Sequence, residues 1–315
     1  MNRYQNLILY MKEKLILKKY QIYQVDAFTK TKLAGNPAGV VTNADDLTDQ
    51  QMQQIARELN NSETAFICQP STKDADIRIR FFTPTMEVPI CGHATIGANF
   101  VRAMENNLDS QTFVQQTGAG NLPIDILKQN DSYQITMTQG KISVEEPLSD
   151  SLQTEIIEAL GLKKEQLNKD CPMAIASTGA PKVMICIDNQ ETLNNLTPDL
   201  AHLKSITPKI NCNGYFVFTM TPNENTLVHG RMFSPANGIN EDPVTGNANG
   251  PLGAYFIKYG IVTPTSDIFE FTAIQGEKIN RTGSMKVRVY LDNNKPVKIQ
   301  IVGDAVIAFS TTIEI

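Results

Sequence analysis

Glu63 is the residue of this 315-residue chain whose position best suits proton transfer. It follows Asn60-Asn61-Ser62 and precedes a strand predicted for residues 64–67. A loop-to-strand junction of this kind can aim a side chain into a cleft, where a carboxylate acts as a general acid or base. The alternative from local sequence is a solvated glutamate beside a strand, since charged residues usually lie at the surface.

Two predicted helix starts supply the next candidates. Gly92-His93 and Gly246-Asn247 each follow a strand and a loop, and each begins a segment rich in small and apolar residues. The first amides of a helix and the positive end of its dipole favour an anion, and glycine lets a ligand approach the backbone closely. We therefore expect Gly92, Gly246 and Asn247 to bind a substrate carboxylate.

His93 and Asp242 stand next to these helix starts. A histidine at position 93 either takes part in proton transfer or merely caps its helix. Asp242 precedes the second helix, where a carboxylate is placed to cap the helix amides or to hold His93 in one tautomer. Both residues are predicted to assist Glu63.

Cys91 raises a different chemistry, in which one thiolate removes a proton and a second thiol returns one to the opposite face of the substrate. A cysteine-dependent epimerase or racemase of this kind needs two cysteines. Residues 241–247 contain none, and Cys212 lies in a separate loop. A buried, inert thiol is the commoner role of a free cysteine, so the thiol mechanism is kept as an alternative to the glutamate mechanism.

The two helix starts belong to what looks like a duplicated unit. Arg80 and Arg231 lie 151 positions apart, each at the end of a predicted strand that precedes a glycine-led helix. At the same offset Glu63 matches Gly214, so one copy carries a carboxylate where the other has no side chain. Because the shared scaffold does not require this difference, it marks a position of chemistry. A ligand between the two helix starts is the expectation.

Composition excludes several classes of function. The net charge is -5 and no basic stripe is present, which argues against a nucleic-acid partner. The five cysteines are scattered without a CxxC pair, which favours a reducing cytoplasm and indicates neither a disulfide framework nor a zinc site. His202 and His229 have no ligands at metal-like spacing, and glycine-rich nucleotide motifs are absent. We predict no metal and no cofactor.

The order of elements predicts two α+β domains. The first has strands at 22–28, 38–41, 64–67, 77–82, 112–116, 122–127 and 133–138, a helix capped by Thr48 and a helix from Gly92. Residues 142–148 are interpreted as the connection. The second has strands at 182–187, 215–219, 227–233, 269–273, 286–290, 297–302 and 305–309, a helix at 198–206 capped by Thr197 and a helix from Gly246 to about 259.

The predicted domain boundaries are 20–141 and 142–306, with a terminal strand at 307–315 that can cross back to the first domain. Residues 1–19 are an N-terminal extension, either a frayed tail or an added edge strand, and Met11 is a possible alternative start. The apolar run at 7–11 is too short for a signal peptide or a membrane span. We therefore expect a soluble protein with no membrane partner.

Five motifs together resemble the phenazine biosynthesis PhzF-like family from about residue 20 to the C-terminus. They are Gln24-Val25-Asp26-Ala27-Phe28, Gly35-Asn36-Pro37-Ala38-Gly39-Val40-Val41, Ser62-Glu63-Thr64-Ala65-Phe66, Gly92-His93-Ala94-Thr95 and Glu241-Asp242-Pro243-Val244-Thr245-Gly246.

The resemblance implies a diaminopimelate epimerase-like fold, with two pseudo-symmetric domains that each wrap a curved, mostly antiparallel sheet around a central helix. It also implies a homodimer, and cofactor-independent isomerisation of a small carboxylic acid in the cleft between the domains. The family's catalytic glutamate matches Glu63, with His93 and Asp242 as supporting residues. The family commonly has serine where this chain has Asn247, which cannot relay a proton as a hydroxyl can. This difference keeps a non-catalytic, small-acid binding protein as a further alternative.

Overall fold

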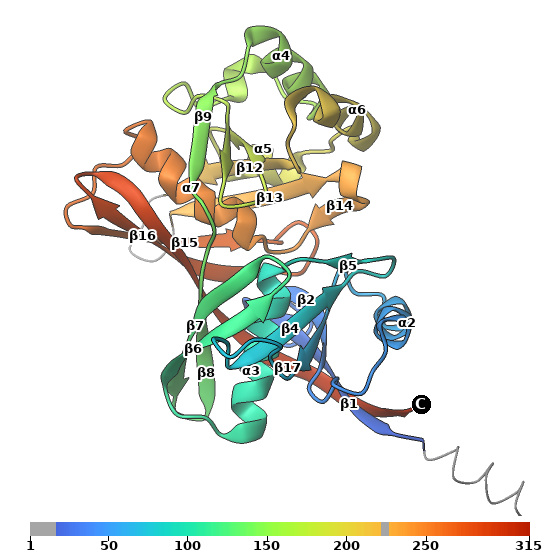
Figure 1. Ribbon diagram of the computed structural model, residues 1–315. Coiled ribbons are helices and arrows are strands. Elements are labelled where there is room, and N and C mark those ends of the chain that lie inside the picture. The colour runs from blue at the N-terminus through green and yellow to red at the C-terminus, as the bar shows by residue number, and fades with distance from the viewer. Residues whose placement is uncertain (1–16, 222–226) are drawn as a thin grey trace, which may run out of the picture.

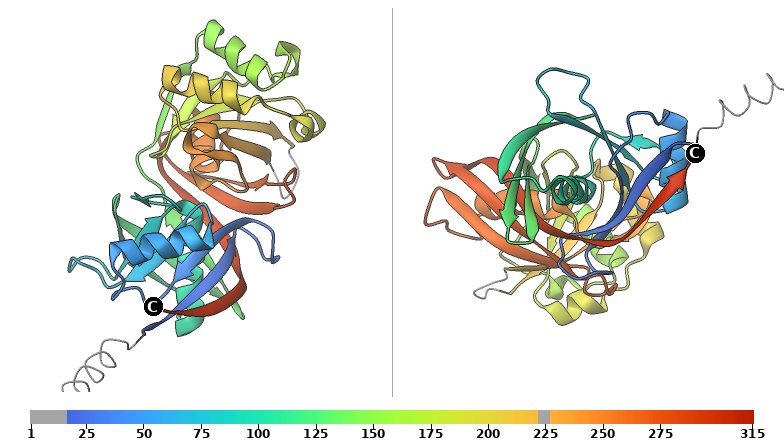
Figure 2. Two further views of the ribbon diagram at one scale, coloured as in Figure 1. Left: turned by 90° about the vertical axis from the view of Figure 1, so that its right-hand side faces the viewer. Right: turned by 90° about the horizontal axis from the view of Figure 1, so that it is seen from below.

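The computed structural model describes residues 17–221 and 227–315, so residues 1–16 of the predicted N-terminal extension, Met11 among them, lie outside the described part. Figure 1 shows two halves, one above the other, that share the long strand β17. Each half curves its strands around one helix, α3 (Gly92–Asn106) in the first and α7 (Gly246–Lys258) in the second. Figure 2 shows α3 end-on inside its curved sheet.

The first half contains α3 and the elements that precede and follow it. They are β1 (Lys19–Ala27), β2 (Asn36–Val41), α2 (Asp49–Leu59), β3 (Thr64–Cys68), β4 (Ile77–Phe82), β5 (Glu87–Val88), β6 (Gln111–Thr117), β7 (Gly120–Gln129) and β8 (Ser132–Thr138).

The second half contains α7 and a larger set of helices. Its elements are β9 (Ser143–Pro147), α4 (Asp150–Ala159), η1 (Lys164–Gln166), β10 (Ala174–Ser177), β11 (Lys182–Cys186), α5 (Gln190–Asn195), α6 (Leu200–Ile210), β12 (Tyr215–Met220), β13 (Val228–Ser234), η2 (Pro235–Asn237), β14 (Ile239–Asp242), β15 (Ile268–Gln275), β16 (Gly283–Asp292) and β17 (Lys295–Glu314).

Strand pairing reproduces the duplication. Most pairs are antiparallel, but β2–β3 and β4–β6 in the first half are parallel, as are β11–β12 and β13–β15 in the second. Thr64 on β3 pairs with Gly39, and Tyr215 on β12, 151 positions later, pairs with Val183. The two halves are therefore built on the same strand register.

Small residues seat the two central helices against their sheets. A Cβ atom at Gly97 of α3 would touch Val25 at 3.4 Å and Ala38 at 3.9 Å, so the sheet already lies at contact distance. A Cβ atom at Gly253 of α7 would come within 2.4 Å of a Val289 methyl group, which leaves no space for a larger residue. This close packing fixes both helix starts relative to the strands.

The strand β17 joins the halves. It pairs with β16 in the second half, then with β8, and finally with β1, from Ala305 opposite Ala27 to Glu314 opposite Lys19. The stretches predicted as two strands at 297–302 and 305–309 are thus one strand, because it passes from one sheet to the next without a turn. The return to the first half begins before residue 307. The domain boundaries themselves stay predictions.

The end of β1 and the loop that leads to β2 also contact the second half. The buried carboxylate of Asp26 forms an ion pair of 2.6 Å with Arg281, which also donates to the backbone oxygens of Ala34 and Gly35. The amide of Ser284 donates to the backbone oxygen of Phe28 at 2.8 Å. These contacts connect the first half to residues 281–284 of the second.

Several details differ from the predictions. Residues 143–147 form strand β9, paired with β10, so the stretch assigned to the connection mostly belongs to the second sheet. The cap of α6 is Asp199, not Thr197, and its carboxylate accepts from the amide of His202 at 2.9 Å. Both residue types cap helices, and only the backbone geometry decides which side chain reaches the amide. Asp199 lies 151 positions after Thr48, the cap of α2, which restores the common offset.

The helices α4 and α5 and the strand β10 had no counterpart in the sequence prediction. The mixture of curved sheet and helices fits the predicted α+β class. Among the described residues, no helix is both long and apolar enough to cross a membrane.

Candidate active site

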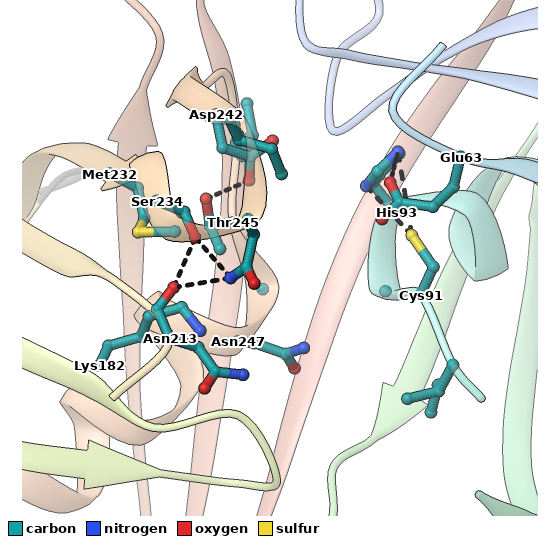
Figure 3. A pocket seen from close by; sticks show the side chains of 16 residues that line it. Glu63, Cys91, His93, Lys182, Asn213, Met232, Ser234, Asp242, Thr245 and Asn247 are labelled. Atoms are coloured by element: carbon teal, nitrogen blue, oxygen red, sulfur yellow. Dashed lines mark hydrogen bonds and ion pairs between the residues drawn. The ribbon is translucent and has the colours of Figure 1, made fainter. Parts of the chain in front are cut away.

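One pocket collects the predicted site residues of both halves (Figure 3). The cavity has a volume of about 150 Å³. Its walls are formed by Glu63, Ile90, Cys91, Gly92 and His93 from the first half, and by Lys182, Asn213, Met232, Ser234, Asn237, Ile239, Asp242, Val244, Thr245, Gly246 and Asn247 from the second. A second cavity of about 460 Å³ adjoins it and shares Ile90, Asn213 and Asn247 with it.

Glu63 points at His93 within this pocket. The Glu63 Oε2 atom lies 3.5 Å from His93 Nε2, and the hydroxyl of Ser62 lies 3.3 Å from the same nitrogen. The Glu63 side chain is 18% exposed and that of His93 is 8% exposed. The alternative of a solvated glutamate was therefore wrong, because the junction before β3 turns the carboxylate inward.

Cys91 contacts the other side of the imidazole. Its sulfur lies 3.4 Å from His93 Nδ1, and the residue is buried at the N-cap of α3. Burial raises the pKa of the Cys91 thiol well above its usual value, and the nearby Glu63 carboxylate adds to this shift. The N-cap of α7 is Thr245, and Cys212 does not line the pocket. A single thiol therefore faces this pocket, in its unreactive protonated form.

The starts of α3 and α7 have no side-chain cap. Neither Cys91 nor Thr245 forms a side-chain cap, so the first amides of α3 and α7 have no such partner. A Cβ atom at Gly92 would meet nothing within 4 Å, and one at Gly246 only ordinary contacts at 3.7 Å or more. Packing therefore does not require glycine at either position.

Asp242 is held differently from either predicted arrangement. Its carboxyl accepts a hydrogen bond from Asn36 Nδ2 at 2.9 Å and another from the hydroxyl of Thr245. It makes no hydrogen bond to His93 and caps no helix amide, so both predicted contacts were wrong. Burial raises the pKa of Asp242, and the charge of His93 partly opposes this shift. Asn36 belongs to the first half, so Asp242 is positioned by both halves.

Asn247 is oriented by Gln139, a residue that the sequence analysis did not single out. Gln139 Nε2 donates to Asn247 Oδ1 at 3.3 Å and to the backbone oxygen of Gly246 at 3.0 Å. With its oxygen engaged, the Asn247 amide nitrogen is free to donate to a ligand. A Cβ atom at Gly250 would lie 1.8 Å from Gln139, so this glycine makes room for the glutamine.

Lys182 was also missed. It begins β11 and its side chain reaches the pocket, although the residue is only 4% exposed. The sequence did carry a signal, since Gly179-Ala180-Pro181-Lys182 repeats Gly35-Asn36-Pro37-Ala38 with lysine in place of alanine.

Glu63, Cys91 and His93 each place one potential ligand atom within 4.8 Å of the others, a spacing compatible with a metal ion. Metal binding would require the Cys91 thiol to lose its proton, and the raised pKa of this thiol opposes that step. The absence of a metal stays a prediction.

Comparison with known proteins places the chain in a family. The sequence profile of the phenazine biosynthesis-like proteins matches residues 25–311. An uncharacterized isomerase of Clostridium acetobutylicum is 51% identical, over 94% of this chain and 98% of the relative. The trans-2,3-dihydro-3-hydroxyanthranilate isomerase of Pseudomonas chlororaphis is 31% identical, over 90% of this chain and 95% of that enzyme. The chain belongs to the phenazine biosynthesis-like family.

Solved structures agree with this assignment. A PhzF-family protein of Bacillus anthracis superposes with a TM-score of 0.85 at 31% identity, covering 95% of this chain and 100% of that one. A hydroxyproline epimerase of Agrobacterium vitis shares the fold at 13% identity and a TM-score of 0.62, covering 95% and 92% of the two chains. The predicted resemblance is confirmed, and the protein is a PhzF-like isomerase with an epimerase-related fold.

Proposed function

We propose that this protein is a cofactor-independent isomerase that moves a proton between two carbons of a small carboxylic acid. The observation that carries the proposal is that Glu63 and His93 share one pocket with two uncapped helix starts. The pocket thus combines a proton carrier with a site for an anion.

The substrate carboxylate binds at the amides of Gly92 and Gly246, where two positive helix ends converge and Asn247 can donate a further hydrogen bond. Glu63 then removes a proton from one carbon, and the electron pair of that C–H bond delocalises toward the substrate carboxylate. The helix ends stabilise this developing charge more than the ground state, which is how they lower the barrier.

The proton on Glu63 returns to a second carbon of the same unsaturated system, so that a double bond shifts and no atom is lost or gained. His93 holds the Glu63 carboxylate at the reacting face through the contact at 3.5 Å. Asp242, fixed by Asn36 and Thr245, places a second carboxyl group on the opposite wall.

The substrate class follows from size and relatives. A cavity of about 150 Å³ has the volume of an engineered protein cavity that accepts benzene, so one six-membered ring fits. The relative from Pseudomonas chlororaphis isomerises trans-2,3-dihydro-3-hydroxyanthranilate. We propose a related cyclic or short unsaturated acid, and Asn247 is the reason to expect a substrate different from that one. The homodimer and the cytoplasmic location stay predictions.

Deuterium exchange tests the proposal. Small unsaturated acids, trans-2,3-dihydro-3-hydroxyanthranilate among them, are incubated with the protein in deuterated water and EDTA, and carbon-bound deuterium is measured. Glu63→Gln keeps the shape of the side chain but removes its titrating proton, so exchange is expected to fall by roughly 10²–10⁴-fold. EDTA is expected to have no effect.

Cys91→Ala is the matched control, because it alters the other contact of His93 and is expected to cost little activity. A cysteine-dependent epimerase predicts the reverse, with an active Glu63→Gln protein and an inactive Cys91→Ala protein. Binding of acids without any exchange would support the non-catalytic alternative instead.

A further inference from the structure

Lys182 is a buried lysine whose ammonium group has no anionic partner in the part of the chain that the structure describes. Its Nζ atom donates to the backbone oxygen of Ala180 at 3.1 Å, and within residues 17–221 and 227–315 no carboxylate forms an ion pair with it. An ammonium group has three donors, and burying it unpaired is costly. The structure therefore maintains this charge beside the pocket for a partner that it does not itself supply.

The two halves differ at this position in a way that complements Glu63. Since Gly39 pairs with Thr64 and Val183 pairs with Tyr215, Ala38 on β2 is the register equivalent of Lys182 on β11. In the first half, the small residue Ala38 on β2 is thus the neighbour of Glu63, which immediately precedes β3. In the second half, Lys182 on β11 is the neighbour of Gly214, which immediately precedes β12 and has no side chain.

The shared fold does not require a lysine here, because the equivalent position in β2 is occupied by the fully buried Ala38. Gly214 itself does not line the pocket, and a Cβ atom there would lie 2.6 Å from the backbone oxygen of Phe233. In Figure 3 the lysine lies on the opposite side of the pocket from Glu63 and His93. The duplicated scaffold therefore presents an acid from one half and a cation from the other.

Asp242 does not account for the lysine charge. Its carboxyl is already hydrogen-bonded to Asn36 and Thr245, and it forms no ion pair with Lys182. Burial lowers the pKa of Lys182 to about 8, while the charges of Cys212 and Asp242 act in the opposite direction. The ammonium form still predominates at pH 7, so the group can bind an anion.

We propose that Lys182 binds a second anionic group of the substrate, which makes the natural substrate a dianion such as a dicarboxylic acid. The inference rests on the proposed function for the first carboxylate, which binds at the starts of α3 and α7. Lys182 receives the second at the other end of the molecule, and the adjoining cavity beyond Asn213 gives a longer dianion room.

Rigid aromatic acids test the inference without knowledge of the natural substrate. Benzoate and the 1,2-, 1,3- and 1,4-benzenedicarboxylates are titrated into the full chain at pH 7 by calorimetry. The best dicarboxylate is expected to bind about 10- to 100-fold more tightly than benzoate, the usual effect of a charge-assisted hydrogen bond. Lys182→Met is expected to remove this preference and to change benzoate affinity less than threefold, whereas Lys182→Arg retains the preference.

Lys73→Met, at an exposed surface position, controls for the change in net charge. The inference fails if no dicarboxylate binds more tightly than benzoate, or if Lys182→Met keeps the preference. The inference also fails if neither benzoate nor any of the benzenedicarboxylates binds. These outcomes are independent of deuterium exchange: exchange without a dicarboxylate preference refutes this inference alone, and the preference without exchange refutes the proposed reaction alone.

Discussion

Replacing Arg231 with methionine is expected to destabilise the protein far more than replacing its repeat equivalent, Arg80. The two arginines make matching contacts. Arg231 donates from Nε and Nη2 to Glu241 at 2.9 and 2.7 Å, and Arg80 donates from the same atoms to Glu87 at 2.8 and 2.7 Å. Each guanidinium also stacks on an aromatic ring, about 5 Å from its centre.

The difference lies in the partners. Glu241 is only 11% exposed, and the third arginine nitrogen donates to the buried backbone oxygens of Leu193 and Leu196 at 3.0 and 2.9 Å. Glu87 is 43% exposed, and the remaining partner of Arg80, Asp49, is 81% exposed. Water can therefore replace Arg80 at its partners but not Arg231.

Arg231→Met keeps the apolar stem and leaves Glu241 as an uncompensated, poorly hydrated charge. The expected loss is about 3–4 kcal/mol. For a chain of 315 residues, with an unfolding entropy of about 2.1 cal/mol/K per residue, that corresponds to a fall in melting temperature of roughly 4–6 °C. Arg80→Met is expected to lose roughly a quarter as much, since exposed ion pairs contribute little.

The assay is thermal unfolding of both variants and the wild type by differential scanning fluorimetry and circular dichroism, at the same protein concentration. Equal losses for the two variants, or a larger loss for Arg80→Met, would refute the reasoning from partner burial. Because Glu241 adjoins Asp242, the Arg231 variant is also expected to bind benzoate more weakly.

Two further predictions concern the pocket. Gly92→Ala and Gly246→Ala should leave the melting temperature within about 2 °C of the wild type, because packing admits a methyl group at both sites. Benzoate affinity is expected to fall about tenfold in each variant. Unchanged affinity would show that no ligand lies against these glycines. The pKa of Asp242 is raised by burial, so its ionisation opposes folding above the unfolded pKa. Asp242→Asn should therefore gain melting temperature relative to the wild type as the pH rises from 4 to 7, and a constant difference would contradict this sign.

The sequence by itself determined the parts of the site that depend on neighbouring residues. A glycine-led helix after a loop is encoded within a few positions, and α3 and α7 begin at the predicted Gly92 and Gly246. The offset of 151 between the copies showed that Glu63 corresponds to Gly214, a position without a side chain, in the second copy. The motifs around these residues then indicated the family.

Tertiary structure decided which side chains reach the pocket from distant strands. Gln139 looks like an ordinary polar residue in the sequence, and the repeated motif that ends at Lys182 does not show that this side chain enters the pocket. Both roles depend on strand register and on the packing of β11 and of the residue after β8 near the start of α7. Asp242 lines the pocket, but its hydrogen-bond partners differ from those predicted, because Asn36 approaches it from 206 positions away in the chain. Contacts at that separation are fixed by the packing of two sheets and leave no local pattern to read.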